Sequence, residues 1–267
     1  LFMNKTPSNE FGILILSYDA LSDLWPVTLS HFFDNFDLDG GRYPIYFGSN
    51  EVFNDDPRVI PILSGKDNDW SSSYLRILEQ IPCSKLLVIL EDLIVVSPVE
   101  FIKLKELVEF GISVKANHIQ YWPSLDNNLD SKNNLFFEIP KKMPYRSTVC
   151  GFWDKRYLMS LLIPGESPWN FEIMGSYRTS YDPGFYVIKS SLFEFVNLIE
   201  KRSWTQESII WATRNNVELN FSCRPVANRA NIIISKMKQC YFNSMARIPW
   251  RYRIKIMSIM RKTFISY

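Results

Sequence analysis

Short, continuously apolar runs alternate with segments of helical periodicity through the first half of the chain. The apolar runs are residues 12–16, 43–47, 58–63 and 86–90. The segments with apolar side chains at helical spacing are residues 20–35, 70–80 and 98–110. A strand that is buried on both faces is apolar throughout, as in a parallel sheet. This alternation therefore predicts an α/β fold with a mostly parallel central sheet flanked by helices.

The second half of the chain is less regular. Three of its segments are predicted to be helical: residues 152–162, 190–202 and 206–215. Residues 121–146 are expected to carry loops on either side of residues 135–137, and residues 163–186 are rich in turn-forming and polar side chains and are expected to be a loop. Because no internal repeat is present, we expect one domain over residues 1–222 and a separate helical tail over residues 223–267.

The charge is divided unevenly along the chain. The formal net charge is +2, but residues 1–218 carry −8, and the remainder holds 10 Lys and Arg and no carboxylate. Between residues 250 and 265, Arg251, Lys255 and Lys262 fall on one helical stripe, and apolar side chains occupy most of the rest. A cationic amphipathic helix is suited to an anionic bilayer interface. A tail that docks on the body or on another subunit, or that is simply solvated, is the alternative.

The cysteines and the apolar runs bear on the cellular compartment. Cys83 and Cys150 have apolar neighbours, as free core cysteines do, and no C-x-x-C pair is present. No apolar stretch approaches the ~18 residues that cross a bilayer. We therefore expect a cytoplasmic protein that is peripheral on the inner face of the cytoplasmic membrane.

Polar side chains follow three of the predicted strands. They are Ser17, Tyr18 and Asp19, then Asn50, and finally Glu91 and Asp92. Ligands of open α/β sheets bind beyond the carboxyl ends of the strands. Two carboxylates beside a core are costly to bury without a cation, and their hard oxygens suit Mg²⁺ or Mn²⁺, which neutralises a phosphate leaving group. The alternative is a strand that emerges into water at the start of a helix cap.

The order and spacing of these features resemble a GT-A-type family of bacterial glycosyltransferases that build surface polysaccharide or lipooligosaccharide. The matching stretches are residues 14–19 with 23–25, 43–46 with Asn50, Trp70 and Ser73 through Arg76, 86–92, 153–158 and 164–172. The resemblance implies a GT-A-like (Rossmann-like) fold and an enzyme that transfers a hexose. It also implies a nucleotide-sugar donor, with a UDP-sugar favoured, and a growing lipooligosaccharide, O-antigen or capsule as the acceptor.

Several residues take donor-side roles under this resemblance. Asp92 is expected to bind the metal ion, with Glu91 as its helper. Leu93 stands where a full acidic motif has a third carboxylate, so metal dependence stays open. Arg76 is expected to contact a phosphate or, alternatively, to form a salt bridge on the helix surface. The residues expected to contact the base and ribose are Tyr18, Asp19, Asn50 and Trp70.

The stretch from Glu166 to Glu172 combines a turn, an aromatic side chain and two carboxylates. An inverting transferase needs a carboxylate that accepts the proton of the acceptor hydroxyl. The resemblance favours Glu172 as this base, with Glu166 second, and Trp169 as a platform for the acceptor sugar. A loop whose Glu caps the next turn is the alternative, and a retaining enzyme would remove the need for this base.

Other function classes have less support. His31 lies in an amphipathic segment typical of a packed histidine, and no G-x-S-x-G, P-loop, G-x-G-x-x-G or zinc spacing is present. Nucleic acid is disfavoured as a partner because the body is acidic and the basic tail has no recognised motif. A GT-A-like scaffold that binds nucleotide or glycan without turnover remains the second hypothesis, since Leu93 replaces an acid.

Overall fold

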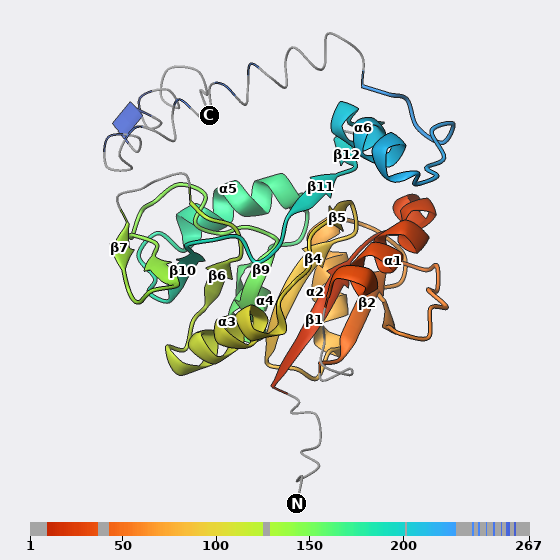
Figure 1. Ribbon diagram of the computed structural model, residues 1–267. Helices are drawn as coiled ribbons and strands as arrows, with labels where there is room; N and C mark the ends of the chain where they lie inside the picture. The colour runs from red at the N-terminus through yellow and green to blue at the C-terminus, as the bar shows by residue number, and fades with distance from the viewer. Residues whose placement is uncertain are drawn as a thin grey trace, which may run out of the picture.

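The computed structural model describes residues 10–36, 43–124, 129–200 and 202–227, together with eight single positions between 237 and 259. Within this part of the chain, a nine-stranded sheet forms the centre of the molecule (Figure 1). Its strands, in spatial order, are β3 (Ile60–Leu63), β2 (Ile45–Ser49), β1 (Phe11–Leu16), β4 (Lys85–Leu90), β9 (Gly151–Asp154), β6 (His118–Gln120), β10 (Phe185–Ile188), β8 (Phe136–Glu138) and β7 (Asp130–Ser131).

Most of these strands run in one direction. The first four are mutually parallel, and β6 is parallel to β10. The exceptions are β9, which lies antiparallel between β4 and β6, and β8. The predicted fold class, an α/β fold with a mostly parallel central sheet, is therefore confirmed.

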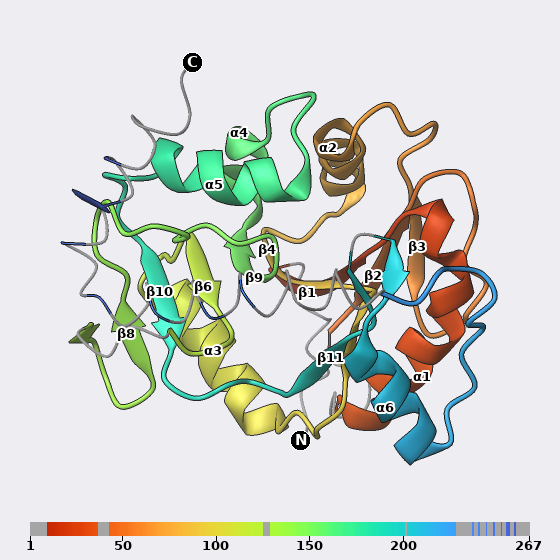
Figure 2. The ribbon, with the colours of Figure 1, turned by 90° about the horizontal axis from the view of Figure 1, so that it is seen from above.

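Helices cover both faces of the sheet, as the view along the strands shows (Figure 2). One face carries α2 (Trp70–Gln80), α4 (Lys155–Leu161) and α5 (Pro168–Arg178), and the other carries α1 (Trp25–Asn35) and α3 (Phe101–Ser113). Alternate residues of a strand point to opposite faces. Ile13 and Ile15 of β1 accordingly pack against α1 and α3, whereas Leu14 and Leu16 pack against α2 and α4. Both faces are buried, which is why the strand sequences are continuously apolar.

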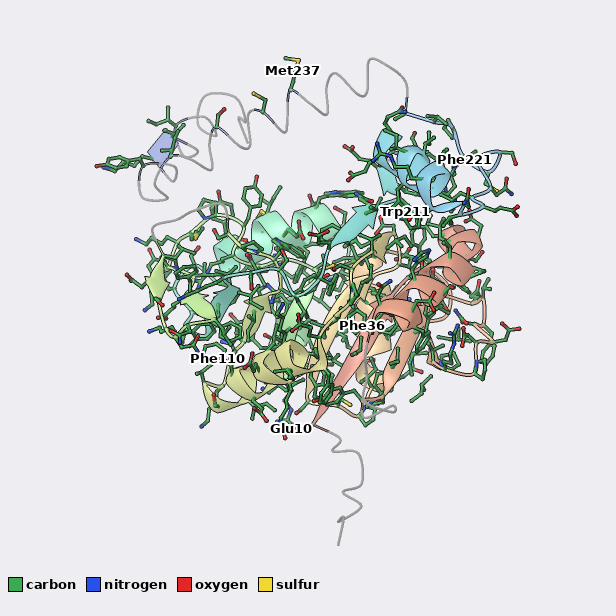
Figure 3. All side chains as sticks on the ribbon, in the orientation of Figure 1. Glu10, Phe36, Phe110, Trp211, Phe221 and Met237 are labelled. Carbon is green, nitrogen blue, oxygen red and sulfur yellow. The ribbon has the colours of Figure 1, made fainter. Side chains whose placement is uncertain are left out.

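A third group of elements packs in a smaller apolar cluster beside the start of α1. It joins β5 (Leu93–Val95) to β11 (Phe195–Asn197), and it includes the hairpin of β12 (Ile199–Glu200) and β13 (Ser203–Trp204). Helix α6 (Gln206–Asn215) follows, and its Trp211, labelled in Figure 3, lies against His31 of α1 with ring centroids 5.0 Å apart. His31 is therefore a packed side chain, as the sequence predicts.

Three predictions for the second half were wrong. Residues 190–202, predicted to be helical, contain the short strands β11 and β12 instead. Residues 163–186, predicted to be a loop, contain α5, whose first turn begins with Pro168 after the Ser167 N-cap. Residues 152–162, predicted to be one helix, are divided between β9 and α4 at Asp154, whose side chain accepts a hydrogen bond from the Tyr157 N–H.

The other predictions have mixed outcomes. Cys83 and Cys150 are buried and free, as predicted. Within the described ranges, no helix is long and apolar enough to cross a membrane. The amphipathic stretch predicted for residues 250–265 lies almost entirely outside the described residues. Residues 224–227, which the sequence assigns to the tail, are bound to the body: Trp204 exchanges backbone hydrogen bonds with Pro225 and Ala227, at 3.0 Å each.

Candidate functional site

The candidate site lies at the carboxyl ends of the parallel strands, where β1, β2 and β4 finish. The antiparallel strand β9 enters the sheet at this same edge, because its first residue, Gly151, pairs with Val88 of β4. Val149 and Cys150 therefore come beside the end of β4, although they lie about sixty residues away in the sequence. The topology thus brings the acidic step Glu91-Asp92 next to a segment from the second half of the chain.

Glu91 is almost completely buried, with 2% of its surface exposed. Its carbonyl oxygen accepts a hydrogen bond from the Thr28 hydroxyl at 2.6 Å, which fixes the backbone of the strand end to α1. Burial raises the pKa of its carboxyl well above the ordinary value, and the neighbouring Asp92 adds to the rise. Burial at this position therefore favours the neutral form of the Glu91 carboxyl.

Asp92 carries the clearest sign of an incomplete site. Its Oδ1 atom is buried and has no hydrogen-bond partner among the described residues. Burial raises the pKa of this carboxyl to about 6. Buried polar atoms are nearly always satisfied in folded proteins, so an unsatisfied one requires an explanation such as a bound water, an ion or a role in catalysis. The backbone here is firmly held, since the Asp92 carbonyl accepts a hydrogen bond from the Leu198 N–H at 2.8 Å.

A divalent ion fits this unsatisfied oxygen. The described residues contain no group of three or more His, Cys, Asp and Glu side chains placed to hold a metal. Mg²⁺, however, commonly uses one or two carboxylates and takes its other ligands from substrate phosphates and water. Asp92 would supply one ligand directly, and Glu91 would orient its neighbours. When bound, such an ion would neutralise charge on a diphosphate leaving group.

Glu172 reaches the same edge from α5. Its Oε1 accepts a hydrogen bond from the Val149 N–H at 3.0 Å, and burial raises the pKa of its carboxyl. Burial raises the pKa of the thiol of Cys150, the residue after Val149, and the charges of Glu172 and Asp92 raise it further. The structure therefore gathers Glu91, Asp92 and Glu172 around the β4–β9 junction.

Asp19 and Asn50 form a closed hydrogen-bond pair at the ends of β1 and β2. The Asp19 carboxylate accepts from the N–H groups of Asn50 and Glu51 at 2.9 Å each, and of Val52 at 3.2 Å. The Asp19 N–H donates to the Asn50 side-chain oxygen at 3.1 Å, and the Asn50 amide donates to Ser64 at 3.2 Å. The hydrogen bonds of these two side chains therefore join the ends of β1, β2 and β3, and the joined loops form one side of the candidate site.

Arg76 is also held by hydrogen bonds within the protein. Its Nε donates to the Ser64 carbonyl at 2.6 Å, and its Nη2 donates to the Lys66 carbonyl at 3.0 Å. The guanidinium therefore attaches α2 to the loop after β3. Trp70, at the start of α2, packs against Tyr74 and Phe171 with centroids 5.3 and 5.7 Å apart. Both residues are engaged by the protein itself.

The two remaining candidates for the acceptor side, Glu166 and Trp169, differ in whether other side chains of the protein already bind them. Glu166 forms a bidentate ion pair with Arg178, with Oε1–Nη1 at 2.7 Å and Oε2–Nη2 at 2.8 Å. Trp169 is 68% exposed in the first turn of α5, three residues before Glu172. Glu166 is thus satisfied inside the protein, whereas the Trp169 ring is open to a ligand.

Sequence reasoning missed two arginines near Tyr18. Burial raises the Tyr18 pKa and Glu91 adds to the rise, while the charges of Arg202 and Arg224 act in the opposite direction. Arg224 is fixed there by an ion pair with Asp23 and by donating to the Ala20 carbonyl at 2.8 Å. The available signal was the purely basic composition after Glu218, but it does not reveal that Arg224 folds back onto η1 (Asp19–Leu24).

No protein-family model matches the chain, and no curated protein matches it in sequence. Solved structures of TarS from S. aureus are similar: residues 1–349 alone have a TM-score of 0.47 at 9% identity, over 70% of this chain and 59% of that one. The complex with UDP has 0.49 at 9%, over 70% and 59%, and that with UDP-GlcNAc has 0.43 at 10%, over 68% and 58%.

The matched part is therefore less than two thirds of each TarS chain. With TM-scores below 0.5, the likeness is weak, and a functional assignment depends on the geometry of the site itself.

Proposed function

We propose that this protein is a glycosyltransferase that moves a sugar from a nucleotide-diphospho-sugar to a hydroxyl of a bacterial surface glycan. The observation that carries the proposal is the gathering of three acidic side chains, Glu91, Asp92 and Glu172, at the carboxyl edge of a mostly parallel sheet. One of their oxygens, Asp92 Oδ1, is buried without a hydrogen-bond partner among the described residues. Ligands of open α/β sheets bind at this edge.

The proposed donor side is centred on Asp92. A nucleotide diphosphate placed beyond β4 would share Mn²⁺ or Mg²⁺ with Asp92, and Tyr18, 40% exposed beside the β1 end, is free to stack on the base or ribose. Asp19 and Asn50 support this subsite by fixing the loops beneath it. Arg76 and Trp70 act in the same indirect way, through the contacts that position α2.

The proposed acceptor side is centred on Glu172. The acceptor oxygen attacks the anomeric carbon, the bond from this carbon to the diphosphate oxygen breaks, and the hydroxyl proton passes to the Glu172 carboxylate. Burial raises the pKa of this group and so increases its strength as a base. The reaction inverts the anomeric configuration, and Trp169 offers its exposed ring to the acceptor sugar. Glu166 serves as a positioning residue through its ion pair with Arg178.

The proposed catalytic unit extends at least to Ala227, because residues 224–227 are bound to the body. The basic tail that follows is proposed to hold this unit on the anionic inner face of the cytoplasmic membrane, where a lipid-linked acceptor would be available. Co-sedimentation with anionic vesicles tests this part. Undiminished binding of protein lacking residues 245–267 would exclude the tail as the anchor.

Transfer and hydrolysis assays over a panel of nucleotide-sugars test the enzyme itself. The wild-type protein is expected to release a nucleoside diphosphate from one donor, whereas Asp92→Ala and Glu172→Gln lose at least 100-fold of this activity, in the range of a lost acid–base group. Full activity in both variants would overturn the assignment of the site.

The second candidate is a scaffold that binds nucleotide or glycan without turnover. Leu93, where a third carboxylate would complete the acidic motif, favours it. Calorimetric titration with UDP, with and without Mn²⁺, separates the two functions. Binding that Mn²⁺ strengthens supports the enzyme, and the absence of UDP binding under both conditions supports the scaffold.

A further inference from the structure

Helix α5 has an apolar surface on its outer side. The side that is turned to the protein carries Phe171, Gly175 and Ser176, which are buried. Surface helices normally present charged and polar side chains to solvent on the opposite side. In α5 the exposed positions are occupied by Trp169, Asn170, Ile173, Met174 and Tyr177. One of these five is polar and none is charged, so the helix is apolar on both sides. We call this outer surface the α5 face.

The positive charges near the α5 face lie at the carboxyl end of the helix. Lys141 and Lys142 are both exposed. The Lys142 N–H donates to the Ser180 carbonyl at 2.7 Å, and its Nζ lies 4.8 Å from the centroid of the exposed Tyr181 ring. Tyr181 follows Tyr177 by four residues, so the two lysines border the aromatic end of this face.

The carboxylates of α5 and its flanking turns are engaged within the protein. Glu172 is turned inward, to a backbone N–H of the β4–β9 junction. Glu166 is paired with Arg178, and Asp182 accepts a hydrogen bond at 2.5 Å from the Tyr157 hydroxyl. The α5 face is therefore apolar and aromatic, and it is bordered by positive charge.

The interface of an anionic bilayer matches this combination. Trp and Tyr are enriched where membrane meets water, because their rings are apolar while their polar atoms stay hydrated. Lysines beside such rings are attracted to anionic headgroups. The chain's own basic tail is a poorer match, because the residues after Glu218 carry the same sign of charge as Lys141 and Lys142. A second copy of the chain would likewise bring like charges to one interface.

We propose that the α5 face rests in the interface of an anionic bilayer, with Lys141 and Lys142 among the lipid headgroups. Helix α5 lies on the side of the molecule toward which the parallel strands point (Figure 1). Its inner side carries Glu172, so the candidate site would lie beside the membrane surface. This contact is made by the folded body and is separate from the basic tail. That it brings Glu172 to a lipid-linked acceptor rests on the proposed function.

Co-sedimentation of the full chain with vesicles tests this proposal. Phosphatidylcholine mixed with phosphatidylglycerol supplies the anionic surface, and phosphatidylcholine alone is the neutral reference. Ile173→Ser combined with Met174→Ser removes two exposed apolar side chains and leaves the buried side of α5 unchanged. We expect about tenfold weaker binding to the anionic vesicles, because two large apolar groups no longer enter the interface.

Lys141→Gln combined with Lys142→Asn tests the charges. Lys142 has a φ of 65°, a left-handed conformation that asparagine adopts more readily than most residues, so folding is preserved. We expect about tenfold weaker binding to the anionic vesicles and unchanged binding to the neutral ones. Equal losses on both kinds of vesicle would contradict the contact of these lysines with anionic headgroups.

The matched control is Ile102→Ser combined with Val114→Ser, at exposed apolar positions of α3 and its C-cap, on the other face of the sheet. It should bind vesicles as the wild type does. Wild-type binding by the folded Ile173→Ser, Met174→Ser variant would overturn the proposal. If this variant instead converted a wild-type dimer to a monomer in sedimentation velocity, with vesicle binding undiminished, the α5 face would be an interface between two copies.

Hydrolysis of nucleotide-sugars without vesicles separates this proposal from the proposed function. Ile173→Ser combined with Met174→Ser should hydrolyse the donor at the wild-type rate, because neither side chain belongs to the candidate site. A wild-type protein that hydrolyses no donor but binds anionic vesicles through α5 would overturn the proposed function alone. One that hydrolyses a donor but binds no vesicles would overturn the membrane contact alone.

Discussion

Two corners of the same sheet edge differ in how well their polar groups are satisfied. At the β1–β2 corner, the Asp19 carboxylate accepts three backbone N–H groups and Asn50 closes the pair. At the β4–β9 corner, burial raises the pKa values of the Asp92 and Glu172 carboxyls, and Asp92 Oδ1 has no hydrogen-bond partner in the described part of the chain. Satisfied groups stabilise the loops around the edge, and unsatisfied ones leave binding capacity for a substrate. The carboxylates of the two corners should therefore respond differently to mutation.

The largest expected effect is on activity at the β4–β9 corner. Glu172→Gln keeps an oxygen that can accept from the Val149 N–H but removes the base, so turnover should fall by about 10²–10⁴-fold. The thermal midpoint should stay close to that of the wild type. Initial rates with saturating donor, together with calorimetric unfolding, measure both quantities.

Glu166→Gln serves as the matched control for this experiment. It breaks the ion pair with Arg178 and should lower the thermal midpoint, with a smaller loss of turnover. If Glu166→Gln abolished turnover and Glu172→Gln did not, the roles of the two carboxylates would be reversed.

The next effect is on stability at the β1–β2 corner. Asp19→Ala leaves three backbone N–H groups without their acceptor, which should cost about 2–3 kcal/mol in the free energy of unfolding. Urea denaturation of this variant measures the loss. Glu51→Ala, an exposed change in the same loop, should lower the free energy of unfolding far less. Equal losses in the two variants would mean that the hydrogen bonds of Asp19 do not stabilise this corner.

A third prediction concerns the pH dependence of stability. The folded pKa of Asp92 is about 6, above its ordinary value of about 3.9, so the ionised form opposes folding. This cost is absent below about pH 4, grows between pH 4 and 6 and is complete above pH 6. Asp92→Asn should therefore raise the free energy of unfolding by about 1–3 kcal/mol at pH 7.5 and leave it unchanged near pH 4.

Urea denaturation of wild type and Asp92→Asn at both pH values, without added metal, provides the measurement. Glu100→Gln, at an exposed N-cap position, is the control and should show no such difference. A loss of stability in Asp92→Asn at pH 7.5 would contradict the view that this carboxylate is unsatisfied.

The smallest effect is expected at Arg76. Arg76→Met removes the donors that hold the loop after β3 but keeps an apolar side chain on α2, so it should cost about 1 kcal/mol. UDP affinity should be unchanged, because these donors bind backbone carbonyls. A large drop in UDP affinity without a loss of stability would restore the direct phosphate contact predicted from the sequence.

The elements that the sequence predicts well are those whose two faces are both buried. Residues 86–90 are apolar throughout, since Leu86 and Leu87 pack on opposite helical layers, and this pattern identifies β4 without other information. Residues 190–202 misled the interpretation because β11 and β12 are stabilised by partners far away in the chain. Phe195 pairs with Val95, a contact that local periodicity does not encode.

The candidate site divides along the same line. The Glu91-Asp92 step can be identified from the sequence because it ends an apolar run. Glu172 was identified only through the resemblance to a glycosyltransferase family. The approach of Glu172 to Val149 could not be predicted, because it depends on the antiparallel insertion of β9. Arg202 and Arg224 were missed for a related reason: their charges act on Tyr18 only once Trp204 packs in one cluster with Leu21 and Leu24 of η1.

The central position of β9 also has a consequence for folding during synthesis. The pair between Lys85 and Asp154 closes a chain separation of 69 residues, and closing so long a loop is slow. Strands β1 to β4 can pair as soon as residue 90 is available, but until β9 arrives β4 is an exposed sheet edge of apolar residues. A ribosome-bound chain would pass through this stage, when the edge most needs protection from aggregation.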